Sequence, residues 1–334
     1  MQRKVIHLKQ KETGAACARK TSIGGQALIE GIMMRGPKKS AMAVRNTKGE
    51  IVTEEFETKG KNRPKICKLP IIRGIFGYID SMSVGYKCLM RSAELSGLGE
   101  TEDENGKEQK LPKWVMTLVT VVSTILGFAL AIGLFVWLPA KLYDWTLSRA
   151  VTTPNAALRS LIKSVFEGVL KILLLVGYMA AISLMKDIRR TFMYHGAEHK
   201  TIFCYEAGLP LTVENVKAQR RFHPRCGTSF LILMLLISIF VSFFIDPISI
   251  AISGNVLPTA LRVLVKLLLI PLIVGLGYEL IKFAGRHDNL LTRIISAPGV
   301  ALQHITVFEP TDEMIECAIK AVELVIPDDD SDRW

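Results

Sequence analysis

One uninterrupted apolar run constrains the fold of this chain more than any other feature. Residues 115–138 read "VMTLVTVVSTILGFALAIGLFVWL" and carry no charge. At about 1.5 Å of rise per helical residue, a helix of this length crosses the hydrocarbon core of a bilayer. The whole chain is 49% hydrophobic, which is high for a soluble protein. The run therefore predicts a transmembrane helix.

Three further segments are long and apolar enough to span a membrane, and the four predicted spans are residues 114–138, 161–185, 228–245 and 257–283. Two of them contain charged side chains, namely Lys163, Glu167 and Lys171 in the second span and Arg262, Lys266 and Glu279 in the fourth. Because charge is costly inside a bilayer, we expect the charged end of the second span to lie at the interface or against other helices.

The distribution of basic residues predicts the orientation of these spans, since lysine and arginine are retained on the cytoplasmic side. Residues 186–227 are rich in both, whereas residues 246–256 contain neither and residues 139–160 contain few. Both termini and the central segment are therefore expected in the cytoplasm. Such basic loops explain the net charge of +11 and attract anionic lipid headgroups, so membrane lipids are expected partners and nucleic acid is not.

The region before the first span carries the strand signals. Residues 1–20 are basic and lack the apolar core of a cleavable signal, which predicts a disordered tail. In residues 21–98, alternating apolar residues flank Asn46-Thr47-Lys48-Gly49, the pattern of a β-hairpin. Helical spacing begins at Ile71 and predicts an amphipathic helix, which either covers a small cytoplasmic core or lies in the membrane interface. Residues 99–113 predict a charged linker.

After the last span, residues 284–334 predict a cytoplasmic C-terminal segment. Thr311 or Asp312 is placed to cap a helix. The residues that this helix is expected to bury are Met314, Ile315, Ala318, Ile319 and Val322. The acidic end that follows, "PDDDSDRW", is expected to fray.

The segment "YHGAEHK", between the second and third spans, carries the strongest chemical signal. His195 and His199 lie four residues apart, so on a helix they project from one face and can hold one metal ion. Glu198 completes the string H-x-x-E-H, which is the inverzincin pattern of two zinc-binding histidines and a glutamate general base. The alternative is a cluster of solvated polar residues at a helix end.

A second pair of ligand types follows in "RRFHPRCG". His223 and Cys226 have the close spacing of a ligand pair on a turn, and two helices separated by Gly208-Leu209-Pro210 would bring both pairs together. The alternatives are a histidine that caps the next span and an inert buried cysteine. Nitrogen and thiolate ligands favour zinc among divalent metals. Cys204 and Glu206 are second candidates, with packing and helix-end roles as their alternatives.

Several long motifs in order resemble the YqhQ-type bacterial membrane proteins, a family of unknown function described as predicted metal-dependent enzymes. The motifs are "SIGGQALIEGIMMRGP", "RGIFGYIDSM", "YHGAEHKTIFCYE", "LTVENVKAQRRFHPRCGTSF" and "APGVALQHITVFEP". The resemblance runs from about residue 22 to about residue 324. It implies a multipass protein of the bacterial inner membrane whose metal centre consists of His195, His199, His223 and Cys226.

The predicted fold is therefore a mainly α membrane protein with four transmembrane helices, a small α+β N-terminal cytoplasmic region and a cytoplasmic metal-binding loop at residues 186–227. The first hypothesis for the function of the protein is a metal-dependent hydrolase at the cytoplasmic face. In this hypothesis the metal has three protein ligands and a water in the fourth position, and Glu198 is the general base. Arg35, Asp80 and the glycine-rich segment near Glu30 could shape its substrate site, or could form surface salt bridges and ordinary turns.

Two alternatives come from other classes. If all four ligands bind zinc, the site is closed and the protein is a metal-stapled scaffold or assembly factor for membrane proteins or lipids. Ligand number separates this hypothesis from the hydrolase. A transporter is the third hypothesis, because Glu279, Lys266 and Arg262 lie within the last span.

Overall fold

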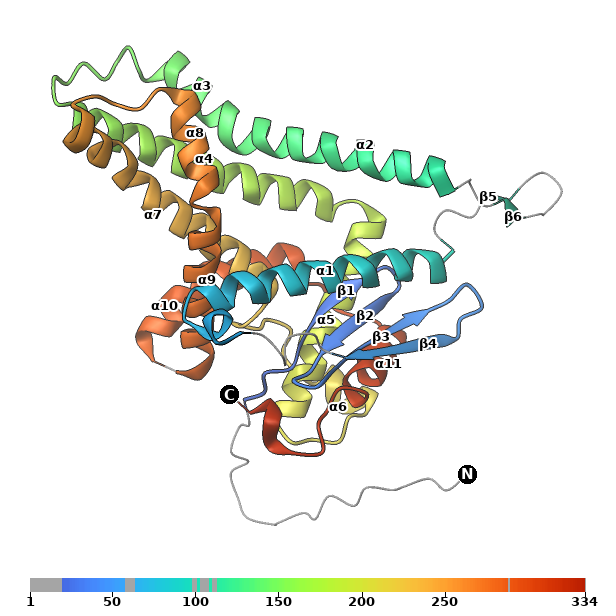
Figure 1. Ribbon diagram of the computed structural model, residues 1–334. Helices are drawn as coiled ribbons and strands as arrows, with labels where there is room; N and C mark the ends of the chain where they lie inside the picture. Colours follow the sequence, from blue (N-terminus) through green and yellow to red (C-terminus); the bar gives the residue numbers. More distant parts are fainter. Residues whose placement is uncertain are drawn as a thin grey trace, which may run out of the picture.

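The computed structural model describes residues 20–57, 64–97, 101–102, 108–109, 113–287 and 289–333. The tail predicted for residues 1–20 and the linker predicted for residues 99–113 lie outside these ranges, apart from their few described residues. Most of the described chain is helical, and one small sheet lies near its N-terminal end (Figure 1).

Four antiparallel strands form this sheet in the order β1-β2-β3-β4. Their bounds are Gly24–Leu28 for β1, Gly31–Arg35 for β2, Lys39–Arg45 for β3 and Ile51–Glu57 for β4. The predicted hairpin is confirmed as β3 and β4, which pair from Arg45 and Ile51 outward. Its turn is closed by Asn46, whose side-chain oxygen accepts hydrogen bonds from the backbone N of Lys48 and of Glu50.

Helices make up the remainder. Those before the central segment are η1 (Lys65–Lys68), α1 (Ile72–Leu95), α2 (Lys113–Ile132), the π-helical turn η2 (Gly133–Trp137), α3 (Leu138–Thr146) and α4 (Ala156–Ser183), with the short strands β5 (Thr101–Glu102) and β6 (Glu108–Gln109) between α1 and α2. Those after it begins are α5 (Lys186–Glu206), α6 (Val213–Lys217), α7 (Gly227–Ser253), α8 (Thr259–Leu268), α9 (Ile270–Arg286), α10 (Leu290–Thr306), α11 (Asp312–Glu323) and η3 (Asp330–Asp332).

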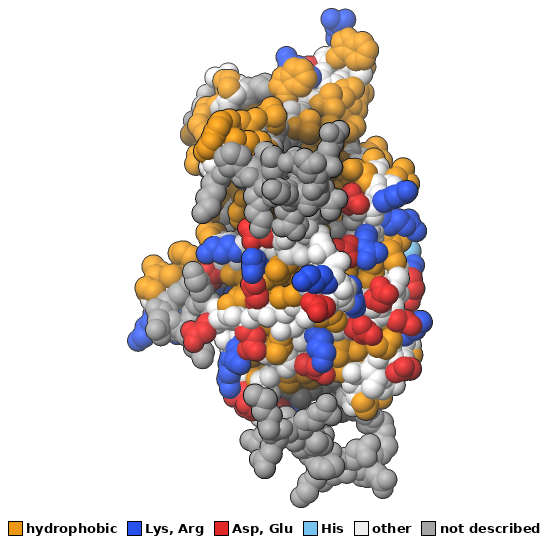
Figure 2. Space-filling model, turned by 90° about the vertical axis from the view of Figure 1, so that its right-hand side faces the viewer, with side chains coloured by type: hydrophobic (Ala, Val, Ile, Leu, Met, Phe, Trp, Pro, Cys, Tyr) orange, Lys and Arg blue, Asp and Glu red, His pale blue; other side chains and the backbone are white. Residues whose placement is uncertain are grey.

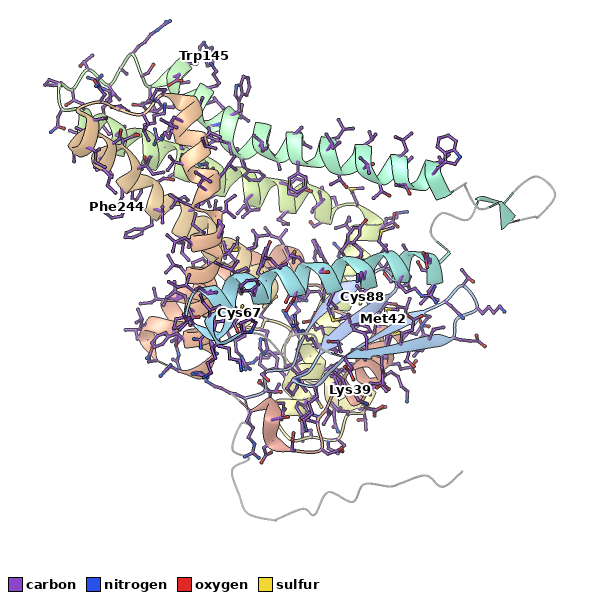
Figure 3. All side chains as sticks on the ribbon, viewed as in Figure 1. Lys39, Met42, Cys67, Cys88, Trp145 and Phe244 are labelled. Carbon is purple, nitrogen blue, oxygen red and sulfur yellow. The ribbon has the colours of Figure 1, made fainter. Side chains whose placement is uncertain are left out.

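The sheet is the middle of three layers, because apolar side chains project from both of its faces and pack against other elements. On one face Met42 packs with Cys88 of α1, the predicted amphipathic helix (Figure 3). On the other face Ile32 and Met34 pack with Tyr194 of α5 and with α11. The five residues predicted to be buried on α11 are all buried. The sheet therefore shares its core with segments from the middle and the end of the chain, and it is not a separate N-terminal unit.

The acidic C-terminal end is ordered, which corrects the expectation that it frays. Asp332 is fully buried and its carboxylate accepts hydrogen bonds from the hydroxyls of Thr21, at 2.7 Å, and of Tyr205, at 3.0 Å. Thr21 also forms an isolated β-bridge with Arg333. Thr21, near the described start of the chain, thus packs against the described end. The hydrogen bonds that the buried Asp332 carboxylate accepts from Thr21 and Tyr205 outweigh the repulsion among the acidic residues there.

Among the described residues, three helices are long and apolar enough to cross a membrane, and there are four if one bent pair counts as a single span. The three are Thr117–Thr146, Leu158–Ser183 and Gly227–Ser253, and the pair is Ala260–Leu268 with Ile270–Arg286. On the face shown in Figure 2, hydrophobic side chains dominate the upper part, while lysine, arginine, aspartate and glutamate mingle over the lower part. This division is compatible with a membrane protein.

The predicted spans differ in detail, since the first continues to Thr146, past its predicted end at residue 138, and the second is shifted to Leu158–Ser183. The third, predicted to end at residue 245, continues to Ser253, because Asp246 is buried in an ion pair with Arg262 of α8 at 3.1 Å. The fourth is interrupted by a bend of 43° between α8 and α9. Pro271 lies in the first turn of α9, and a proline there cannot continue a preceding helix without a clash.

The charged residues within these helices have partners. Glu167 of α4 pairs with Lys266 of α8 at 3.1 Å, and Lys163 with Asp144 at 3.4 Å, so the charged part of α4 lies against other helices as expected. Glu279 of α9 accepts from Arg73 of α1 at 2.7 Å. The residues that suggested a transporter therefore hold helices together, and Arg73 fastens the amphipathic helix to α9.

Candidate metal centre

Helix α5 carries the two central histidines on one face, as their spacing predicts. The ring of His195 donates from Nδ1 to the carbonyl oxygen of Thr306 at 3.1 Å. The ring of His199 donates from Nδ1 to the carbonyl of Arg221 at 2.6 Å. Because each Nδ1 donates its proton to a carbonyl, Nε2 is the nitrogen of each ring that is left to face the cluster, which is the usual arrangement of a histidine that binds a metal.

A glycine allows the first of these contacts. Gly196 follows His195, and a Cβ on it would lie 2.0 Å from the carbonyl oxygen of Phe308. The chain after α10 therefore approaches the backbone of α5 directly, and the N–H of Phe308 donates to the carbonyl of Phe192 at 3.0 Å. This approach brings Thr306 to the His195 ring.

Cys226 reaches the same place from the beginning of α7. It is the N-cap residue, and its Sγ accepts from the backbone N of Thr228 at 3.4 Å. The Thr228 hydroxyl lies 3.2 Å from the same sulfur. The positive end of the helix dipole and these two groups favour the thiolate, which is the form that binds metals.

His195, His199 and Cys226 form the His-His-Cys cluster, in which the ligand atoms all lie within 4.8 Å of one another. The Nε2 of His195 lies 3.0 Å from the Cys226 sulfur. The Nε2 of His199 is buried, and no residue in the described part of the chain forms a hydrogen bond with it. A buried nitrogen without a partner, aimed at a nitrogen and a sulfur ligand, fits a metal ion of the zinc type.

The charges in the cluster also favour a cation. Burial acts to raise the pKa of the Cys226 thiol, but the adjacent charges of His195 and His199 hold that pKa well below its usual value. Burial likewise acts to lower the pKa of His195, and the Cys226 thiolate overcomes it and raises that pKa to about 9. The cluster thus keeps a positive charge beside its sulfur, and a metal ion can replace the proton.

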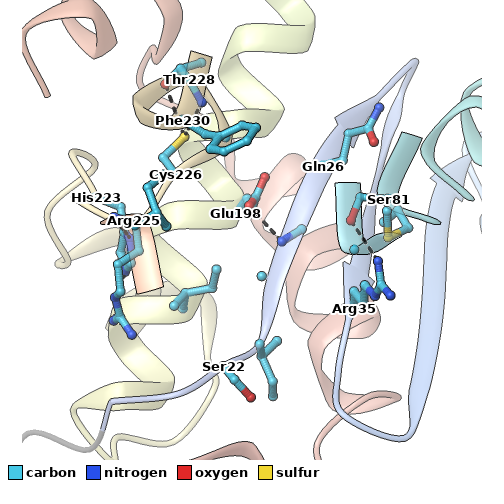
Figure 4. Close-up of a pocket in the computed structure, with 18 of the residues that line it drawn as sticks. Ser22, Gln26, Arg35, Ser81, Glu198, His223, Arg225, Cys226, Thr228 and Phe230 are labelled. Carbon is cyan, nitrogen blue, oxygen red and sulfur yellow. Dashed lines mark hydrogen bonds between the residues drawn. The ribbon is translucent and has the colours of Figure 1, made fainter. Parts of the chain in front are cut away.

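Glu198 lies next to the cluster and points toward strand β1 (Figure 4). Its Oε1 accepts from the backbone N of Gly25 at 3.0 Å. Its Oε2 is buried and has no hydrogen-bond partner among the described residues. Burial raises the pKa of this carboxyl, and the charges of His195 and His199 only partly oppose the effect. A carboxylate in this environment is suited to take up a proton.

The structure does not bring His223 into the cluster. Its ring centre lies 5.6 Å from that of His199, but its Nδ1 accepts from the backbone N of Arg225 at 3.2 Å and its Nε2 lies 3.9 Å from Glu206. Burial lowers the pKa of His223 to about 4, so the ring is neutral. Glu206 also accepts from the Arg225 guanidinium and from the backbone N of Thr21. These residues form a hydrogen-bonded network beside the cluster.

The remaining candidates have other positions. Cys204 is buried and its sulfur lies 3.5 Å from the carbonyl of Pro210, outside the cluster. Glu30 binds Arg190 at 2.7 Å and Tyr194 at 3.2 Å, which ties the β1–β2 turn to α5. Asp80 is not among the residues that line the pocket described next, whereas Arg35 is.

A pocket of about 670 Å³ opens beside Glu198 and the cluster. Glu198, His199, His223 and Cys226 line one side, and the sheet contributes Gly25 and Arg35 (Figure 4). Arg35 donates from its guanidinium to the hydroxyl of Ser81 on α1 at 2.8 Å. Pockets of this size typically bind small ligands, so Glu198 and two of the three residues of the His-His-Cys cluster face a space that a small molecule can fill.

Three backbone groups of the site have little signal in the sequence. The N–H of Gly25 and the carbonyls of Thr306 and Arg221 position Glu198 and the two rings, yet a backbone group is independent of residue type. Gln303 of α10 was not predicted as a site residue, although it lies in the motif "APGVALQHITVFEP". Its side chain accepts from the backbone N of His223 and donates to the backbone carbonyl of the same residue. Only the dense glycines near residue 25 hinted at a close approach.

The fold and site define a mostly helical protein that carries three or four membrane-compatible helices and a His-His-Cys cluster beside a pocket. The family described as "Protein of unknown function (DUF1385)" matches residues 69–328, and the chain belongs to this family. The "Uncharacterized protein YqhQ" of Bacillus subtilis (strain 168) is 36% identical over 304 residues, which cover 89% of this chain and 90% of the relative. No solved structure matches the chain.

Proposed function

We propose that the protein is a metal-dependent hydrolase embedded in the bacterial cell membrane, with His195, His199 and Cys226 as ligands of a zinc ion and Glu198 as the general base. The observation that carries the proposal is the Oε2 atom of Glu198, which is buried, has no partner among the described residues and lies beside the pocket. A zinc ion with three protein ligands has an open position and supplies a water of lowered pKa.

The residues of the chain have separate roles in this proposal. Thr306 and Arg221 orient the two rings through their carbonyl oxygens, and Gly25 orients the carboxylate of Glu198. Glu198 takes a proton from water at Oε2 and returns it to the leaving group. The raised pKa of this carboxyl supports the role, because a base is most effective when its pKa is close to the working pH.

The same geometry weighs against a metal-stapled scaffold. A closed structural zinc site needs four protein ligands, and His223, the predicted fourth, faces Glu206 and Arg225. Its ring is near enough to the cluster that a change of side-chain position could complete a closed site. Ligand number therefore remains the measurement that separates the two functions.

The proposal includes a topology with both termini in the cytoplasm, which the basic residues of segment 186–227 support. Membrane lipids and membrane proteins are the partners that this location offers. Reporter fusions at each terminus and after residue 150 test the topology. Cytoplasmic reporters are expected at both ends and an external one in the α3–α4 connection.

The activity itself is tested with the detergent-purified protein and a set of chromogenic ester, amide and phosphoester probes. Turnover of one class is expected, with loss after metal chelation and recovery on adding zinc. Two results together would contradict the hydrolase. The purified protein would retain one zinc per chain and hydrolyse none of the probes. Cells with the Glu198→Gln variant would also show none of the defects that loss of the gene causes.

A further inference from the structure

The pocket beside the cluster has one polar side and one apolar side. The polar side includes Glu198, His199 and Cys226. The apolar side is built by helices α1, α7 and α9, which contribute Tyr78, Met82, Phe230, Leu231, Tyr278 and Ile281. A ligand that fills both sides carries a polar group next to the metal ligands and a hydrocarbon part against the helices.

The apolar side belongs to helices that are compatible with a membrane. Phe230 and Leu231 lie in the first turns of α7, the candidate span Gly227–Ser253, and Tyr278 and Ile281 lie in α9 of the bent pair. In the proposed topology, the cytoplasmic ends of these spans form the apolar wall of the pocket. This topology places the pocket at the interface between the bilayer and the cytoplasm.

The apolar wall continues onto the outer surface. Leu231 is 38% exposed and Met82 is 50% exposed, and both line the pocket. Phe76, Ile79 and Tyr86 extend the exposed apolar face along α1. The Arg73–Glu279 pair fastens the start of α1 to α9, which belongs to the bent pair of membrane-compatible helices. An exposed apolar face of this kind is typical of an interfacial helix.

We propose that the pocket binds an acyl-chain lipid of the inner leaflet, with the hydrocarbon chain between α1, α7 and α9 and an ester carbonyl beside Glu198. The binding rests on the membrane location, and the reaction rests on the proposed function. In that reaction the oxygen of water bonds to the carbonyl carbon and the ester C–O bond breaks. Glu198 carries the proton to the departing alcohol, so the products are a carboxylic acid and an alcohol.

The test uses the full chain in nanodiscs that contain phosphatidylglycerol with a diazirine near the end of one acyl chain. After illumination, mass spectrometry locates the labelled residues. Labels are expected on the pocket sides of α1 and of the first turns of α7. Labels only on membrane-facing residues outside the pocket would overturn the proposal.

A glycine pair supplies matched variants. Gly77 of α1 lines the pocket, and a Cβ there would meet only Tyr278, at 3.8 Å. Gly177 of α4 does not line it, and a Cβ there has no neighbour within 4 Å. Gly77→Leu fills the pocket and is expected to reduce pocket labelling severalfold, whereas Gly177→Leu leaves it unchanged. Equal labelling in the two variants would contradict the proposal.

A second pair guards against a folding defect in Gly77→Leu, because both of its positions are exposed on α1. Met82 lines the pocket and Ser83, which is also exposed, does not. Met82→Glu is expected to reduce pocket labelling and Ser83→Glu to leave it. If the pocket is labelled but no ester is hydrolysed, the lipid site is supported and the hydrolase is rejected. Zinc-dependent turnover of a short soluble ester, with no pocket labelling, removes the lipid site and retains the hydrolase.

Discussion

Gly25 of β1 donates its backbone N–H to Oε1 of Glu198 on α5, at 3.0 Å and across 173 positions of sequence. This bond fixes one carboxylate oxygen and leaves the other, Oε2, without a hydrogen-bond partner among the described residues. The glycine-rich start of the sheet is therefore part of the site, since β1 approaches α5 closely only if residue 25 lacks a side chain.

Alanine at position 25 is expected to disturb both stability and the carboxylate. A Cβ there would lie 2.6 Å from the carbonyl oxygen of Met33 and 3.1 Å from the Glu198 carboxyl carbon. Overpacking of this kind costs about 1–3 kcal/mol, so Gly25→Ala should unfold at a lower temperature. Gly24→Ala is the control, because a Cβ at Gly24 meets nothing within 4 Å. Equal melting temperatures for the two variants would show that β1 does not approach α5 this closely.

Glu198→Gln is expected to abolish turnover without releasing the metal. The amide keeps the shape of the side chain but cannot take up a proton, and removal of a general base typically lowers kcat by about 100-fold or more. Metal content and melting temperature should stay close to those of the unaltered protein. Glu316→Gln, at an exposed side chain of α11, is the control and should be fully active. Full activity in Glu198→Gln excludes this residue as the base.

Metal content should show that three of the four predicted ligands are needed to bind zinc and that the fourth is not. Elemental analysis of purified variants is expected to show loss of zinc in His195→Ala, His199→Ala and Cys226→Ala. His223→Ala should retain it, because the His223 ring faces Glu206 and Arg225. Cys204→Ala is the control for removal of a buried thiol. If His223→Ala loses zinc as completely as Cys226→Ala, the site has four ligands and the scaffold is favoured.

Gln303→Leu is expected to loosen the turn that presents Cys226. The Gln303 side chain is fully buried, accepts from the His223 backbone N at 2.8 Å and donates to the His223 carbonyl at 2.6 Å. Loss of both bonds leaves buried backbone groups unpaired, at about 1–3 kcal/mol each. Lower thermal stability and weaker zinc retention should appear together. Gln219→Leu, at a partly exposed side chain, should change neither.

The meeting of His195, His199 and Cys226 could be predicted because its signal is local. A spacing of four places His195 and His199 on one helical face whatever surrounds the helix, and Cys226 begins an obvious apolar helix. The position of His223 outside the cluster could not be predicted, since it depends on Glu206 and on Gln303, 80 residues further along the chain. Chain spacing limits which residues can meet, but it does not choose among them.

The strands and spans show the same division. Alternation and a turn sequence were enough to predict the β3–β4 hairpin. The burial of the second face of the sheet could not be predicted in this way. That face is covered by α11, which is more than 200 residues away in the printed sequence. The extension of α7 past residue 245 was missed because Asp246 looked like an end of the span. Its partner Arg262, on another helix, makes the charge acceptable there.

The hydrogen bond from His195 to Thr306 has a consequence for biosynthesis. A ribosome that has just delivered both histidines and Cys226 to the membrane has not yet made α10, whose last residue supplies the carbonyl that fixes the first ring. In the proposed topology, the last candidate span is inserted and the chain returns to the cytoplasm before this ring is set. We therefore expect high-affinity metal loading of the proposed site to follow the synthesis of α10.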